Sequence, residues 1–85
     1  MTRHYSKIDS KTKYELILSD CSYNVAMDWL QKDMAKYNVE VYKSEYDTER
    51  KLVVLYAGKF SYILNDYRLI RKFYYDDERG YLLGE

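Results

Sequence analysis

The fold is decided by one stretch of the chain, residues 22–37, which reads SYNVAMDWLQKDMAKY. Its apolar residues recur at steps of four, three, four and three, at Tyr23, Met27, Leu30, Met34 and Tyr37. That spacing predicts one amphipathic helix with a single apolar stripe. Asp20 or Ser22 can cap the first turn. Asn38 tolerates the left-handed conformation and can therefore end the helix.

The chain before this helix contains one strand pattern. Residues 13–19 alternate between apolar and polar, which places Tyr14, Leu16 and Leu18 on one core-facing side of a strand. Residues 1–11 lack periodicity and are mixed polar, so we interpret them as a tail or an edge strand.

The chain after the helix begins with a hairpin pattern. Residues 39–46 and 51–57 read as two strands joined by a short polar connection, which predicts an antiparallel pair. Alternation places Val39, Val41 and Lys43 on one side of the first of these strands. It places Tyr42 and Tyr46 on the other side. If the valines meet the helix, the tyrosines form an aromatic surface on the opposite side of the sheet.

Residues 58–75 fit two structures. As a helix, their apolar residues step by three and four through Phe60, Ile63, Tyr67, Ile70 and Tyr74, which would complete a ferredoxin-like β-α-β-β-α-β order. As strands, they contain two candidate two-residue turns, at 58–59 and 65–66. Phe, Tyr and Ile fill eight of the sixteen positions from 60 to 75, without any Ala, Glu or Gln, and this composition favours strands.

These patterns predict an α+β fold in a single domain over residues 1–85. One amphipathic helix packs on an antiparallel sheet of four to six strands, in the order β-α-β-β followed by a C-terminal meander. The meander turns at residues 76–80, where Gly80 can take a positive φ, and returns as a short strand at 81–83. The predicted core consists of Leu16, Leu18, Met27, Leu30, Met34, Val39, Val41, Leu52, Val54 and Ile70.

The residue inventory argues against an enzyme. His4 and Cys21 are the only histidine and cysteine, so the chain has no disulfide framework, no pattern of metal ligands and no readily assembled catalytic triad. The three glycines form no phosphate-binding loop. We therefore expect no catalytic residues, no cofactor and no metal site.

The charge and hydropathy patterns suggest a cytoplasmic protein without a membrane partner. The polar N-terminal residues show no signal peptide. The longest apolar run, residues 52–57, is far too short to span a bilayer. Lys plus Arg balances Asp plus Glu at 14 each, but residues 59–72 carry four cations against one acid.

The leading hypothesis is a small non-enzymatic regulatory protein that binds a partner protein through an aromatic surface. Twelve tyrosines are hard to bury completely, because each ring favours burial while its hydroxyl favours water or a partner. Trp29 lies about 100° from the helix stripe and has Val25 one turn earlier. The predicted partner-binding residues are Val25, Trp29, Tyr42 and Tyr46. In composition, such compact chains rich in Tyr and Lys and poor in Cys resemble accessory proteins of phages and mobile elements, many of which inhibit a host enzyme or a defence nuclease.

Two other hypotheses stay open. A nucleic-acid-binding regulator would use the basic N-terminus together with Tyr67, Arg68, Arg71, Lys72 and Tyr74, where cations meet phosphates and rings stack on bases. The aromatic motif of the RNA-recognition module is missing, since residues 51–58 read KLVVLYAG. In a homo-oligomeric structural domain, the tyrosine surface would be a dimer interface.

Overall fold

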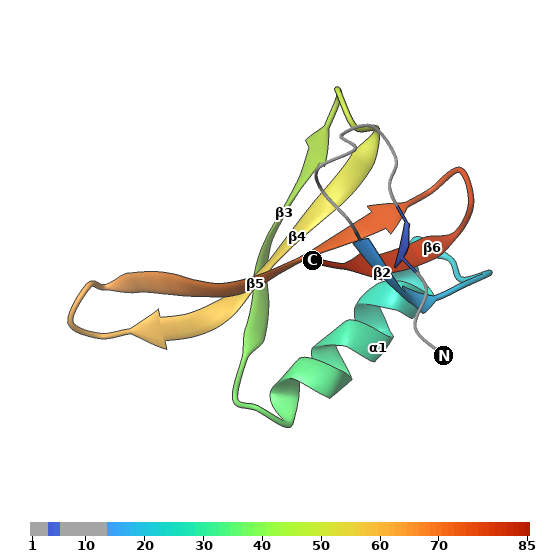
Figure 1. Ribbon diagram of the computed structural model, residues 1–85. Coiled ribbons are helices and arrows are strands. Elements are labelled where there is room, and N and C mark those ends of the chain that lie inside the picture. The colour runs from blue at the N-terminus through green and yellow to red at the C-terminus, as the bar shows by residue number, and fades with distance from the viewer. Residues whose placement is uncertain (1–3, 6–13) are drawn as a thin grey trace.

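The structure is a computed structural model that describes residues 4–5 and 14–85. One helix, α1 (Tyr23–Ala35), packs on a single antiparallel sheet of six strands (Figure 1). The strands are β1 (His4–Tyr5), β2 (Tyr14–Leu18), β3 (Glu40–Asp47), β4 (Leu52–Ser61), β5 (Asp66–Asp76) and β6 (Tyr81–Gly84), and they lie in the order β1-β2-β6-β5-β4-β3. The predicted α+β class is confirmed. The ferredoxin-like alternative is wrong, because the residues of its second helix form the end of β4 and most of β5.

The helix begins as its sequence predicts. The Ser22 hydroxyl accepts a hydrogen bond from the backbone N–H of Val25 at 3.2 Å, which caps the first turn. Ala26, Leu30 and Met34, one turn apart, are buried against the sheet. Asn38 takes a φ of 58° in the turn after the helix. Because α1 ends at Ala35, Tyr37 leaves the apolar stripe and is 63% exposed, so its predicted place in the helix was wrong.

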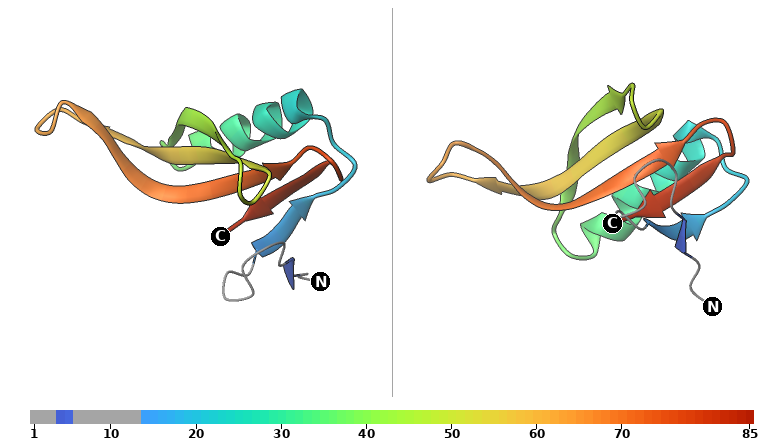
Figure 2. Two further views of the ribbon diagram at one scale, coloured as in Figure 1. Left: turned by 90° about the horizontal axis from the view of Figure 1, so that it is seen from above. Right: turned by 45° about the horizontal axis from the view of Figure 1, so that its top comes forward.

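The sheet is apolar on both faces. The face that α1 covers, here the helix face, buries Val39, Leu55, Ala57, Phe73, Tyr75 and Leu82 with the three helix residues. The opposite face, here the far face, buries a second cluster of Tyr14, Leu52, Val54, Tyr74 and Leu83. Figure 2 shows α1 on one side of the sheet only. Burial on both faces explains the continuous apolar run in β4.

Irregular pairing in β2 and β3 overturned two predicted faces. The register of β2 shifts between Leu16 and Leu18, so Leu16 packs in the far-face cluster while Leu18 packs in the helix-face cluster. The register of β3 likewise shifts between Val41 and Lys43. A bulge inserts one residue into a strand and reverses the alternation that follows it.

The β3 bulge separates the two tyrosines that alternation had placed together. Lys43 now lies opposite Tyr56 on the far face, away from the valines, and Tyr46 lies opposite Val53 on the helix face. Tyr42 contacts the ring of Tyr56 and therefore stays on the far face.

Residues 58–75 form strands, as the composition favours, and their single turn overlaps the second candidate turn only at Asn65. Positions 62–65 make the turn between β4 and β5, with Asn65 at a φ of 54°, while residues 58–59 continue β4. Ile70 was predicted to be in the core. It lies at a register shift in β5 and is 55% exposed. The predicted turn after β5 is confirmed at residues 77–80, where Gly80 has a φ of 71°.

The β4–β5 hairpin extends beyond the rest of the sheet. The β3–β4 pairing ends where Glu40, the first residue of β3, lies opposite Gly58, and the β5–β6 pairing ends where Gly84 lies opposite Phe73. Residues 59–72, here called the arm, therefore have neither β3 nor β6 beside them and project from the body (Figure 1, Figure 2).

Gly58 stands where the arm joins the body. A Cβ at this position would lie 2.1 Å from the backbone oxygen of Arg68 and 3.0 Å from the Tyr42 ring. The absence of a side chain thus lets β5 approach β4 at the register shift between Ala57 and Gly58.

We expect Gly58→Ala to lower the free energy of unfolding by about 2 kcal/mol or more, because backbone would have to move. Gly84→Ala is the matched control, since its Cβ would meet only the movable ends of the Arg71 and Ile17 side chains. Urea unfolding of both variants measures the difference. Equal losses would contradict a special requirement at Gly58.

Candidate functional site

The turn of the arm exposes a cluster of apolar side chains. Tyr62 is 89% exposed, Ile63 96% and Leu64 63%. Phe60, Leu69 and Ile70 add further exposed apolar surface on the two strands behind them. Single exposed apolar residues are normal, whereas a contiguous group at the end of a projecting hairpin is a candidate interaction site. We call Tyr62, Ile63 and Leu64 the tip.

A continuous row of five aromatic rings connects the tip to the body. Tyr56 contacts Tyr42, which stacks on Tyr67 with ring centroids 4.5 Å apart and planes 4° from parallel. Tyr67 meets Phe60 edge-to-face at 5.3 Å, and Phe60 meets Tyr62 at 5.1 Å. An isolated two-stranded hairpin is marginally stable at best. The row, whose Tyr42 comes from β3, braces the arm from the third strand.

Two of the row's hydroxyls are held by carboxylates on β3. Tyr67 donates to Glu40, and Tyr56 donates to Glu45 at 2.6 Å. Each of these hydrogen bonds raises the pKa of its tyrosine above the ordinary value. The ammonium groups of Lys43 and Lys72 lie 5.2 and 5.5 Å from the Tyr56 centroid. Tyr56 and Tyr67 are therefore already engaged in contacts within the molecule.

The cations of the arm differ from those of the body. Lys32, Lys36, Lys43 and Arg50 each lie within 4.0 Å of a carboxylate. Among the described residues, none of the arm's four cations, Lys59, Arg68, Arg71 and Lys72, has a carboxylate within that distance. Lys59 and Arg68 are directly paired across the two strands.

A hollow of about 370 Å³ lies at the base of the arm, beside the C-terminal end of α1. Its lining combines apolar residues with two of the arm's cations and one acid: Met34, Tyr37, Val39, Ile70, Lys59, Arg71 and Asp33. The Asp33 carboxylate is already within 3.5 Å of Lys36, so the uncompensated charge in this hollow is positive.

The predicted partner-binding residues do not form one surface. Val25 and Trp29 are adjacent on the outer side of α1, where they are 57% and 37% exposed. Tyr42 lies in the aromatic row, and Tyr46 is 53% exposed on the helix face of edge strand β3. Trp29 is thus partly exposed beside Val25, but the four residues form no joint surface.

The predicted nucleic-acid-binding residues gather more closely, with one exception. Tyr67, Arg68, Arg71 and Lys72 all belong to the arm. Tyr74 is only 2% exposed, because its ring packs edge-to-face on Tyr14 in the far-face cluster. Tyr74 was therefore wrongly assigned to a binding surface. Of the basic N-terminal residues, Arg3, Lys7, Lys11 and Lys13 lie outside the described part of the chain.

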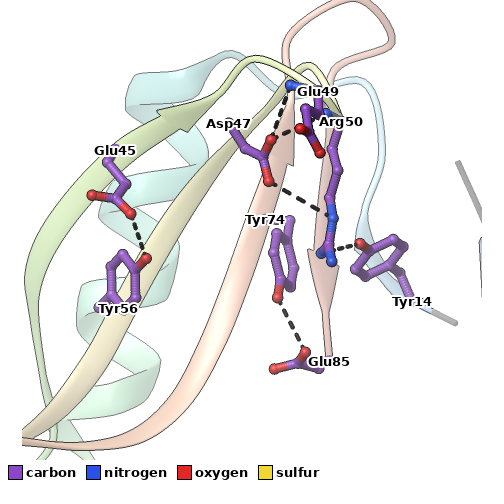
Figure 3. Close-up of polar contacts among 8 residues, drawn as sticks. All are labelled: Tyr14, Glu45, Asp47, Glu49, Arg50, Tyr56, Tyr74 and Glu85. Carbon is purple, nitrogen blue, oxygen red and sulfur yellow. Dashed lines mark hydrogen bonds and ion pairs between the residues drawn. The ribbon is translucent and has the colours of Figure 1, made fainter. Parts of the chain in front are cut away.

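A polar cluster on the far face ties three distant parts of the chain together (Figure 3). The Arg50 guanidinium donates to the Tyr14 hydroxyl at 2.7 Å and lies 3.7 Å from Asp47. The Tyr74 hydroxyl donates to Glu85 at 3.1 Å. Burial and the nearby Glu85 carboxylate raise the pKa of Tyr74 to about 12. These contacts join β2, the β3–β4 turn and the C-terminal residue, so their role is structural.

Sequence reasoning missed the tip itself. Ile63 was noted only as part of a hypothetical helix stripe, and Leu64 was not singled out. The available signal was the sequence of residues 62–65, YILN, in which three apolar residues precede an asparagine. Had the turn been placed there, its unusual apolar content would have been apparent, because turns usually carry polar residues, glycine or proline.

No known protein family matches this chain, and comparisons with curated proteins and with solved structures give no match either. In the part of the chain that the structure describes, no helix has the length and apolar content needed to cross a membrane. Within residues 4–5 and 14–85, no three His, Cys, Asp or Glu side chains are grouped so that they could hold a metal ion.

The raised pKa of Tyr74 predicts loss of stability in alkali. Its folded pKa of about 12 exceeds the ordinary value of 10.0, so its contribution is complete below pH 10 and is lost as pH rises toward 12. We expect Tyr74→Phe to flatten this part of the pH profile. Urea unfolding across the alkaline range tests it, with tyrosinate absorbance reporting ionisation. An unchanged alkaline slope in the variant would contradict the assignment.

Proposed function

We propose that this protein is a small non-enzymatic binding protein that acts by inserting the tip of its arm into a site on a partner protein. The observation that carries the proposal is the exposure of Tyr62, Ile63 and Leu64 at the end of a projecting hairpin. A convex apolar tip fits a concave apolar site. Occupying such a site on an enzyme would inhibit it, which is the mode of action expected from the composition.

The size of the tip supports specific binding. Burying a side chain such as Ile or Leu contributes roughly 1.5–3 kcal/mol, and a few buried anchors supply most of the energy of many interfaces. The aromatic row holds the arm before the partner arrives, so less conformational entropy is lost on association. A braced hairpin is thus better suited to insertion than a flexible loop of the same composition.

Nucleic-acid binding is the second candidate, favoured by the gathering of Arg68, Arg71 and Lys72 on one projecting element. Two observations make it the weaker proposal. Tyr42 and Tyr67 cover one face of each other, and Lys43 and Lys72 lie over Tyr56, so these rings offer little free surface for bases. The tip is aliphatic as well as aromatic, at Ile63 and Leu64.

The test is a pair of substitutions at the tip, Ile63→Ser with Leu64→Ser. Both side chains are exposed, so we expect the free energy of unfolding to change by no more than about 0.5 kcal/mol. Capture of the partner from cells that express the protein should fall about tenfold or more. Quantitative pull-down with wild-type and variant protein at equal concentration measures the loss.

Val25→Ser with Trp29→Ala is the matched control, because it removes the other exposed apolar pair, on α1. It should leave capture of the same partner unchanged. If the control abolishes capture and the tip variant does not, the binding surface is the outer side of α1, as the sequence first suggested. Analytical sedimentation of the wild type separates a second copy of the chain from a different partner.

A further inference from the structure

The pairing of Lys59 with Arg68 is unfavourable for the protein alone. These residues are directly opposite each other in the β4–β5 register, so their side chains share one face of the arm. Like charges in this position destabilise a sheet. In the described part of the chain neither has a carboxylate within 4.0 Å, although cations of the body do.

The two cations lie just behind the tip. The last pair before the turn is Ser61 with Asp66, two residues from the pair formed by Lys59 and Arg68. Two residues of strand span roughly 7 Å. If a partner's pocket receives the tip, the rim of that pocket therefore lies beside Lys59 and Arg68.

Resting on the function proposed above, we infer that the partner's site is an apolar pocket whose rim carries carboxylates, and that one of them sits between Lys59 and Arg68. Such a carboxylate would remove the like-charge repulsion and form charge-assisted hydrogen bonds with both cations. The hollow at the arm base also combines cations with apolar surface, because Lys59 and Arg71 line it together with Ile70. The partner is thus a protein with an acidic surface around its apolar pocket.

The edges of the arm argue against a second copy as this partner. Pairing two arms along β5 would bring together two copies of residues 66–72, each of which carries Arg68, Arg71 and Lys72 against Asp66 alone. The register shift beside Ile70 also interrupts the strand that would have to pair. Charges and bulges of this kind oppose edge-to-edge association.

The experiment places a photoreactive benzoyl-phenylalanine at Tyr62, in the tip, and cross-links the full chain in the cells that express it. The Lys59→Gln/Arg68→Gln and Lys59→Glu/Arg68→Glu pairs are compared with the parent protein. We expect the glutamate pair to lower the cross-linking yield about tenfold, and the yield of the glutamine pair to lie between that of the glutamate pair and that of the parent protein. Lys32→Glu/Lys51→Glu, on α1 and in the β3–β4 turn, changes the net charge by the same amount as the glutamate pair and should keep the yield within about twofold.

Two further readouts separate recognition from a structural effect. Lys59→Gln/Arg68→Gln should raise the urea midpoint of the free protein while weakening binding, because it removes a repulsive pair. If Lys59 and Arg68 had a purely structural role, the substitutions would lower the urea midpoint and the binding together. Mass spectrometry of the cross-linked partner should place Asp or Glu residues beside the residue bound to position 62.

Failure of the acidic rim and failure of the proposed binding function give different outcomes. If no protein is cross-linked at the tip, the proposed function fails and the inference fails with it. If a protein is cross-linked with a yield indifferent to Lys59 and Arg68, only the inference fails. It is also overturned if no protein is cross-linked while phosphatidylserine vesicles or duplex DNA bind the arm with the same charge dependence.

Discussion

The close approach of β5 to Gly58 is the constraint on which the molecule depends. β4 and β5 contribute buried residues to both faces of the sheet, so their pairing aligns the helix-face and far-face clusters at once. At Gly58 the missing side chain admits the Arg68 backbone, and the Tyr42 ring lies close above. The arm leaves the body at this point. A single residue without a Cβ therefore connects the core to the candidate site.

The tyrosine content mostly serves structure. Tyr14, Tyr74 and Tyr75 are core residues whose hydroxyls reach Arg50, Glu85 and the Cys21 carbonyl, respectively. Most of the aromatic row is also tyrosine, and two of its hydroxyls, those of Tyr56 and Tyr67, pair with carboxylates on β3. A ring with a polar end suits a sheet that is apolar but thin, because each ring can be buried while its hydroxyl finds a partner. In the proposed function, contact with a partner is made largely by the aliphatic residues of the tip.

The helix and the order of the elements were predictable, since an apolar stripe with a Ser22 cap and an Asn38 stop fits few other structures. The side-chain faces of β2 and β3 were not, because a single bulge reverses alternation and leaves no periodic signal. For the same reason Tyr42 and Tyr46 were joined wrongly. The basic residues of the arm could be grouped from the sequence. The tip could not, because the apolar spacing of residues 60–74 also fits a helix. The composition favoured strands over a helix, but the position of the turn depends on the pairing of β5 with β4.

The pairing of β2 with β6 has a consequence for synthesis. β2 lies near the start of the described chain, yet one of its two neighbours in the sheet, β6, comes from residues 81–84, with Glu15 opposite Gly84. Arg50 and Glu85 reach the same cluster from the middle and the end. During translation, β2 cannot pair with β6 until residues 81–84 have been synthesised. Contacts between such distant residues slow folding. The hairpins formed by β3, β4 and β5 can therefore form first, and β6 then pairs with both β5 and β2.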